Sequence, residues 1–155
     1  MSQVLSARRP AFTLIELIVV LAIFGIMIMA TTPFLVKFQH TQKVGSLAED
    51  LAFSLRKAQH RALVAEQDSA WGVALLPTQL VVFSGDSYAS RITRWDSGLS
   101  FSSTEYTLSS APSLTEIVYQ KGSGLPLRTG TITVIHSSGY VRQVSVGSGG
   151  LISLQ

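Results

Sequence analysis

The stretch RRPAFTLIELIVVLAIFGIMIMA (residues 8–30) decides how the N-terminal part of the chain folds. Beyond its proline, only Thr13 and Glu16 carry a polar side chain. An apolar run of about 20 residues is long enough to cross a bilayer as a helix. The pattern therefore predicts that residues 12–36 form the transmembrane half of a long N-terminal helix.

The flanking charges indicate how this segment is oriented. Arg8 and Arg9 precede the apolar run, and no acidic residue stands before them. This bias keeps the N-terminal end in the cytoplasm and places the rest of the chain on the far side of the membrane. An ordinary secretory signal has a shorter apolar region and a small-x-small cleavage site, which Ile28-Met29-Ala30 does not offer. The segment could also be a plain membrane anchor or a buried core helix, and the all-round apolarity disfavours the core helix.

Glu16 distinguishes a plain anchor from a functional segment. A carboxylate costs about 2.5–3.5 kcal/mol at the centre of a membrane and less near its surface. A plain anchor has no reason to carry it, so Glu16 is expected to have a positively charged partner. An N-terminal amine that is created by cleavage just before Phe12, on a neighbouring copy, would supply one.

The residues AFTLIEL (11–17) resemble the class III signal of type IV pilins and type II secretion pseudopilins. The resemblance implies a leader at 1–11 that prepilin peptidase removes between Ala11 and Phe12, followed by N-methylation of Phe12. Ala11 stands where the family usually has glycine. Glu16 becomes the fifth mature residue, where the family places its assembly glutamate. Implied partners are the peptidase, other pilin or pseudopilin subunits, inner-membrane lipid and, as a further candidate, secreted cargo.

The helix is expected to continue as an amphipathic half over residues 37–67. Gly25 and Pro33 fall where the same family often has helix-loosening residues, and a kink is expected at Pro33. Beyond it, apolar residues recur at steps of three and four and predict a face that packs on the chain's own domain. That face consists of Val44, Leu47, Leu51, Leu55, Ala58, Ala62 and Ala65.

Residues 68–155 change to strand-like patterning with Gly, Ser and Pro turns, which predicts a small antiparallel β-sandwich and an α+β fold overall. Turns are expected at Ser97-Gly98 and Ser137–Gly139, and flexible connections at the glycine-rich 122–124 and 147–150. The expected strands are 71–76, 79–84, 91–95, 99–101, 106–108, 116–120, 131–136, 140–146 and 151–154.

This half is similar to the H-type minor pseudopilin of type II secretion and to related minor pilins of type IV pili. The resemblance is carried by Trp71-Gly72-Val73, Val82-Phe83, Gly85-Asp86, Thr131-Ile132-Thr133 and the glycine-rich tail. It implies a long helix with two antiparallel sheets, in a single-pass inner-membrane protein with an extracytoplasmic domain. Three functions stay open: a subunit of the secretion pseudopilus, a minor pilin for pilus assembly, adhesion or DNA uptake, and a membrane-tethered β-domain that does not assemble.

No residue pattern for catalysis is found. The chain has no cysteine, hence no thiolate nucleophile or ligand. His40, His60 and His136 are expected as solvated or capping residues, so no metal, cofactor or catalytic residue is predicted. The formal charge is +3, with Arg8 and Arg9 in the leader. Binding of nucleic acid is not expected, because the remaining candidates (Lys121, Arg128 and Arg142) are scattered.

Overall fold

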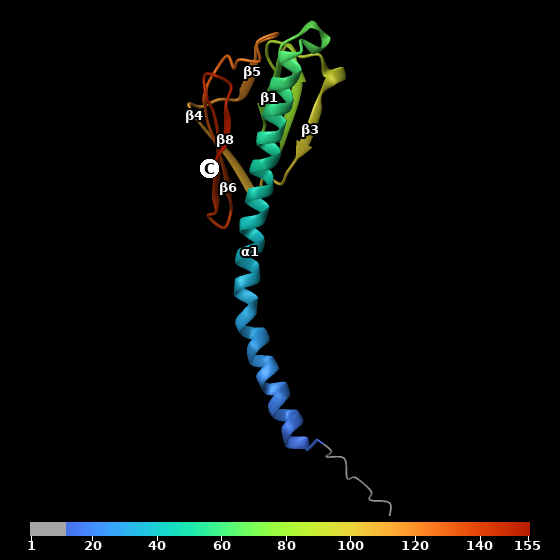
Figure 1. Cartoon of the computed structure of the whole chain (residues 1–155), viewed down its shortest axis with the longest axis vertical. Helices are drawn as coiled ribbons and strands as arrows, with labels where there is room; N and C mark the ends of the chain where they lie inside the picture. The colour runs from blue at the N-terminus through green and yellow to red at the C-terminus, as the bar shows by residue number, and fades with distance from the viewer. Residues whose placement is uncertain (1–11) are drawn as a thin grey trace, which may run out of the picture. The chain divides into compact units, whose positions relative to one another are not determined.

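The helix α1 (Leu14–Leu63) is the longest element of the chain (Figure 1). The computed structural model describes residues 12–155, without the side chains of 30–34 and 36; the leader expected at 1–11, with Arg8, Arg9 and Ala11, lies outside these residues. The chain divides into two compact units, Met1–Phe38 and Gln39–Gln155. Helix α1 contributes to both, and each unit is described by itself.

In the first unit, α1 exposes its apolar side chains. Phe12, Leu14, Ile15 and Met29 are each more than 70% exposed. Among the described residues, no helical segment meets the length and apolarity needed to cross a membrane. The transmembrane half expected at 12–36 stays a prediction. Helix α1 continues without a break through Gly25 and Pro33, and the kink expected there stays a prediction too.

In the second unit, α1 buries the face that its spacing predicts. Val44, Leu51 and Leu55 are almost completely buried, as are Leu47, Ala58 and Ala62. The helix ends at Leu63, and a 3-10 turn η1 (Glu66–Asp68) follows it, within the range where the helix was expected to continue. Ala65, expected on the buried face, instead has a left-handed backbone with φ of 49° that turns the chain toward the first strand.

Two four-stranded antiparallel sheets follow the helix and confirm the α+β fold. The first has the strand order β3-β2-β1-β5, and the second has the order β4-β6-β7-β8. The strands of the first sheet are β1 (Trp71–Leu75), β2 (Gln79–Ser84), β3 (Ser97–Ser100) and β5 (Glu116–Tyr119). Those of the second sheet are β4 (Tyr106–Ala111), β6 (Gly130–His136), β7 (Val141–Val146) and β8 (Ile152–Leu154).

Two of the local predictions are wrong. The strand expected at 91–95 is a loop with a 3-10 turn, η2 (Thr93–Trp95), because Arg91 donates to Asp96 at 2.8 Å and to the Tyr88 carbonyl at 2.8 Å and so bends the chain. The turn expected at Ser97-Gly98 is the start of β3, which pairs with Val82 and Val81 of β2. Pairing with a long neighbouring strand overrides the local preference for a turn.

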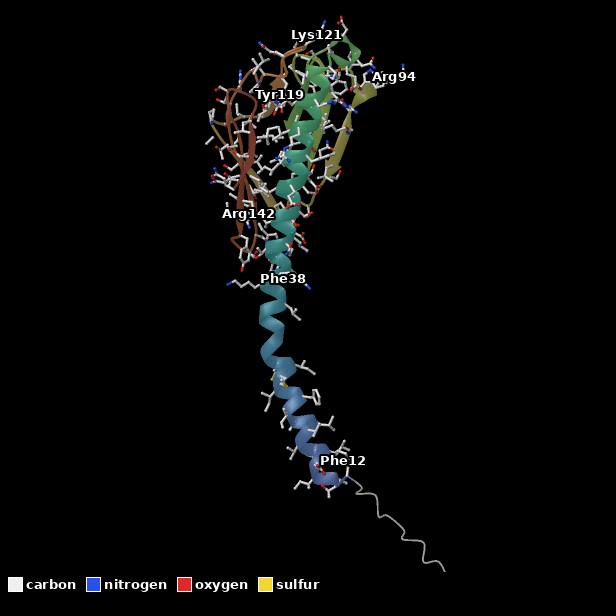
Figure 2. The ribbon with its side chains drawn as sticks, in the orientation of Figure 1. Phe12, Phe38, Arg94, Tyr119, Lys121 and Arg142 are labelled. Carbon is white, nitrogen blue, oxygen red and sulfur yellow. The ribbon has the colours of Figure 1, made fainter. Side chains whose placement is uncertain are left out.

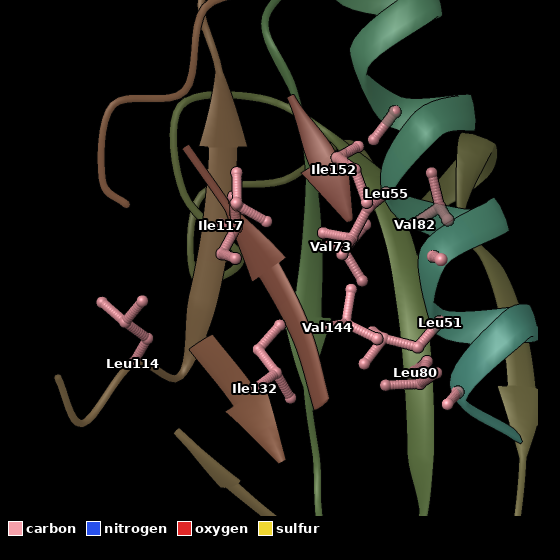
Figure 3. Close-up of a cluster of buried hydrophobic side chains, with 14 of the residues drawn as sticks. Leu51, Leu55, Val73, Leu80, Val82, Leu114, Ile117, Ile132, Val144 and Ile152 are labelled. Carbon is pink, nitrogen blue, oxygen red and sulfur yellow. The ribbon is translucent and has the colours of Figure 1, made fainter. Parts of the chain in front are cut away.

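The main core lies between α1 and both sheets (Figure 3). Leu51 and Leu55 of the helix belong to the same buried cluster as Val73 of the first sheet and Ile132 and Val144 of the second. A second, smaller cluster covers the other face of the first sheet and includes Val81, Phe83 and Val118. Strand β1 is therefore buried on both faces, which explains why four of its five residues are fully buried.

Candidate functional site

Glu16 lies in the first turn of α1, and Thr13 caps its backbone amide. Thr13 stands just before the helix, and its Oγ1 accepts a hydrogen bond from the Glu16 amide at 3.3 Å. A Thr followed three residues later by Glu is the pattern of a capping box. A carboxylate in the first turn also interacts favourably with the positive end of the helix dipole. Glu16 thus has a local structural role in addition to the assembly role that the sequence suggests.

The Glu16 carboxylate is exposed and lies among exposed apolar side chains. Within residues 12–155, the ion pairs join other residues, and none includes Glu16. Its neighbours Ile15 and Leu17 are 71% and 56% exposed, so they do not shield it. The geometry leaves the carboxylate available to a charged group of another molecule.

The apolar surface of this segment surrounds the helix. Large side chains at nearly every position are between 39% and 81% exposed (Figure 2), among them Leu17, Ile18, Val19, Val20, Leu21, Ile23, Phe24 and Ile26. Gly25 has no atom near the position where a Cβ would stand. Burial of such a surface requires lipid or other protein chains, because the described residues of this unit provide no second layer.

The structure brings His40 and His136 together, contrary to the expectation that each histidine is a separate solvated or capping residue. Their ring centroids are 4.8 Å apart, and the Tyr106 ring lies 5.2 Å from that of His136. His136 is only 4% exposed. Its Nδ1 accepts a hydrogen bond from the Ser138 amide at 3.0 Å, so it does cap the turn that follows β6. His60 is exposed on the helix.

The histidine contact does not make a metal site. In the part of the chain that the structure describes, no group of three or more His, Cys, Asp or Glu side chains could hold a metal ion. No local pattern in the sequence indicates the contact, because it depends on how α1 lies against β6. The pair therefore acts as packing between the helix and the second sheet.

Two basic side chains of the domain, Arg91 and Lys121, are paired with carboxylates within it. Lys121 forms an ion pair with Asp68. Arg128 lines a pocket that Asp86 and Glu116 also line. The hydrogen bond to Asp96 raises the pKa of Arg91 above its ordinary value. Figure 2 shows Lys121 and Arg142 well apart, so these two candidates do not share one patch.

Gln59 ties the helix to two glycine loops, a contact that the sequence did not indicate. Its Nε2 donates to the carbonyl of Gly124 at 3.2 Å and to that of Gly150 at 2.9 Å. Both glycines have positive φ, 62° and 80°, which side chains with a Cβ rarely adopt. The segments predicted to be flexible connections are therefore attached to α1 by one amide.

Comparison with known protein families finds one match, to the family described as "Prokaryotic N-terminal methylation motif", over residues 7–32. No curated protein and no solved structure matches the chain. The matched segment contains the Ala11-Phe12 bond, Glu16 and Gly25. The chain therefore carries the N-terminal methylation motif of a type IV pilin-like precursor, joined to a helix and two antiparallel sheets that fit a pilin-like fold.

Proposed function

We propose that this chain is a membrane-anchored structural subunit of a pilus-like filament and not an enzyme. Prepilin peptidase cleaves it between Ala11 and Phe12, Phe12 is N-methylated, and the apolar half of α1 then packs with those of other subunits. The observation that carries the proposal is the methylation motif at residues 7–32, together with the exposed apolar side chains of the α1 segment that lies within it.

In this proposal, Glu16 sets the register between subunits. It pairs with the new Phe12 amine of a neighbouring copy, and each charge then offsets the burial of the other. A neighbour that is shifted along the helix would leave two unpaired charges in an apolar surrounding, which is strongly unfavourable. The exposure of the carboxylate at the start of α1 supports this role.

Within this class, we favour a minor pseudopilin of the type II secretion pseudopilus in the inner membrane, with the β-domain outside the cytoplasm. The arrangement of two antiparallel four-stranded sheets after one long helix supports it, since this is what the H-type resemblance implies. A minor pilin of a type IV pilus shares these features. Cross-linking to secretion pseudopilins or to pilus pilins in the native host distinguishes the two.

The processing step is tested by the N-terminal sequence and the intact mass of the membrane-extracted protein, made with and without prepilin peptidase. We expect a methylated start at Phe12 only when the peptidase is present. An intact leader in the presence of active peptidase would contradict the proposal and favour a static anchor. A start after Ala30 would mean an ordinary secreted domain and would also contradict it.

The register role is tested by Glu16→Gln, because glutamine also suits the capping box and so removes only the charge. The matched control is Thr13→Ala, which removes the cap at a cost of about 1 kcal/mol and keeps the carboxylate. The pairing of Glu16 with a neighbour's Phe12 places residue 23 of one copy level with residue 19 of the next. The chain has no cysteine, so disulfide cross-linking between an Ile23→Cys copy and a Val19→Cys copy in each background reports this register. We expect both variants to be cleaved, but only Thr13→Ala to cross-link. Equal cross-linking of Glu16→Gln would refute the register role.

A further inference from the structure

Strand β4 is an edge strand of the second sheet. A hydrogen bond to Glu105, the residue before β4, shows which backbone groups of the strand point toward β6 and which point away. The Ser137 amide donates to the Glu105 carbonyl at 2.8 Å, and Tyr106 pairs with His136 in the same register. In antiparallel pairing, alternate residues bond to the partner strand. The backbone groups of Leu108 and Ser110 therefore point away from β6, at the free edge.

These edge groups are unoccupied among the described residues. No backbone or side-chain hydrogen bond reaches the amide or the carbonyl of Leu108, and the bonds of Ser110 are made by its hydroxyl, to Leu114. Tyr106 fits the same phase, because its amide points away from β6 and donates to the Ser102 carbonyl at 2.9 Å. The edge thus presents two donors and two acceptors at the spacing of an extended chain.

Of the other three edge strands, β5 and β8 are partly covered, and β3 serves as the comparison in the test below. On β5, the Val118 carbonyl accepts a hydrogen bond from the Leu127 amide at 2.8 Å. On β8, the Ile152 carbonyl accepts one from Arg56 at 3.4 Å. Edge strands are normally protected by such cover, by charges, by proline or by a bulge. Strand β4, with the sequence YTLSSA, has none of these devices along its six residues.

A hollow of about 350 Å³ lies beside this edge. One wall is β4 itself, and the other is formed by Leu75, Leu76 and Pro77 at the end of β1, with Leu114. None of its lining residues carries a charge at neutral pH. A charged side chain would lose its hydration there without finding a partner, so the site is complementary in charge to an uncharged segment.

We propose that the β4 edge and this hollow bind an extended, uncharged segment of a partner protein. The segment adds a fifth strand to the second sheet by bonding to the backbone of Leu108 and Ser110, and it places an apolar side chain against Leu75 and Leu114. Thr107 and Ser109, which alternate with Leu108 and Ser110 along β4, have exposed side chains. This inference is independent of leader cleavage and of the role of Glu16.

The probe is a capped hexapeptide of alternating threonine and valine, N-methylated on alternate amides so that only one edge can pair. The control peptide is N-methylated on both edges and cannot add to a sheet. Binding to the full chain in detergent micelles is followed by amide hydrogen exchange, measured by NMR. At about 1 mM probe, we expect the amides of Leu108 and Ser110 to exchange about tenfold more slowly, and the control peptide to have no effect.

A second test introduces a positive charge on the β4 edge. Ser109→Lys places an exposed lysine beside the hollow and is expected to weaken binding of the probe by about tenfold. Gln143→Lys places the same charge on β7, an interior strand of the same sheet, and is expected to bind normally. An unchanged unfolding midpoint shows that either variant is folded. Equal slowing by both peptides, equal binding by both variants, or protection of Gly98 and Ser100 on β3 instead would overturn the proposal.

Discussion

Truncation of Leu51 tests whether the second half of α1 is a structural part of the β-domain. Leu51 has no exposed surface and lies in the cluster that joins the helix to both sheets (Figure 3). Leu-to-Ala changes at such sites cost about 2–5 kcal/mol, because they lose apolar burial and leave a cavity. We take about 3 kcal/mol, which lowers the melting temperature by about 12 °C for a domain of this size. The matched control is Phe53→Ala, since Phe53 is on the same helix but 66% exposed.

The measurement follows the fluorescence of Trp71, which is completely buried, during thermal unfolding of the full chain in micelles. The other tryptophan is Trp95, and Trp95→Phe in every variant makes Trp71 the sole reporter. We expect Phe53→Ala to change stability by no more than about 0.5 kcal/mol. If Leu51→Ala melts within a degree or two of Phe53→Ala, the helix is not part of the domain core and the reasoning is refuted.

Two further predictions concern the first sheet. Gly72→Ala places a Cβ at 2.6 Å from Phe83 Cζ and 2.8 Å from the Ile117 carbonyl, and should destabilise the domain by about 1–3 kcal/mol in the same melts; Gly98→Ala, whose nearest contact is 3.4 Å, is the control, and equal effects would contradict the overpacking argument. Burial raises the pKa of Tyr119 above its usual 10.0. Above about pH 10 the Tyr119 hydroxyl of the unfolded chain loses its proton, while that of the folded chain keeps it. The free energy of unfolding is therefore unaffected below this pH and falls as the pH rises above it. Tyr119→Phe should reduce this loss between about pH 9 and pH 11, and should raise stability at neutral pH by about 1 kcal/mol, because the buried hydroxyl has no partner among the described residues. Urea unfolding measures both effects, and an unchanged alkaline loss in the variant would contradict the assignment.

The elements that the sequence predicted correctly are those with a strong local pattern. The three- and four-residue steps from Val44 to Ala62 define the buried face of α1. Strands β1, β2, β6 and β7 follow runs of β-branched and aromatic residues bounded by turns. Where the pattern was weak, long-range contacts decided the structure: the bond from Arg91 to Asp96 turns 91–95 into a loop, and pairing with β2 makes Ser97-Gly98 a strand.

The features of the candidate site also separate into local ones, which the sequence predicts, and long-range contacts, which it does not. The methylation motif is contiguous in the sequence, so its residues could be predicted directly. The contact between His40 and His136 joins residues far apart in the chain, and the bonds of Gln59 join segments 65 and 91 positions apart. Such contacts depend on how the helix lies against the sheets, which no local spacing encodes. The capping role of Thr13 for Glu16 emerges only with the structure, although the Thr-x-x-Glu spacing is a usable signal for it.

The amide of Gln59 also limits how this domain can vary. A Cβ on Gly150 would collide with the Gln59 side chain, and one on Gly124 would press on the helix backbone at Gln59. A shorter side chain at position 59 would relieve the crowding at Gly150 but would leave two loop carbonyls without their donor. The three positions are thus mutually constrained. Chains that share this design should exchange them as a set, and a library that randomises one of the two loops should return glycine at that loop's position.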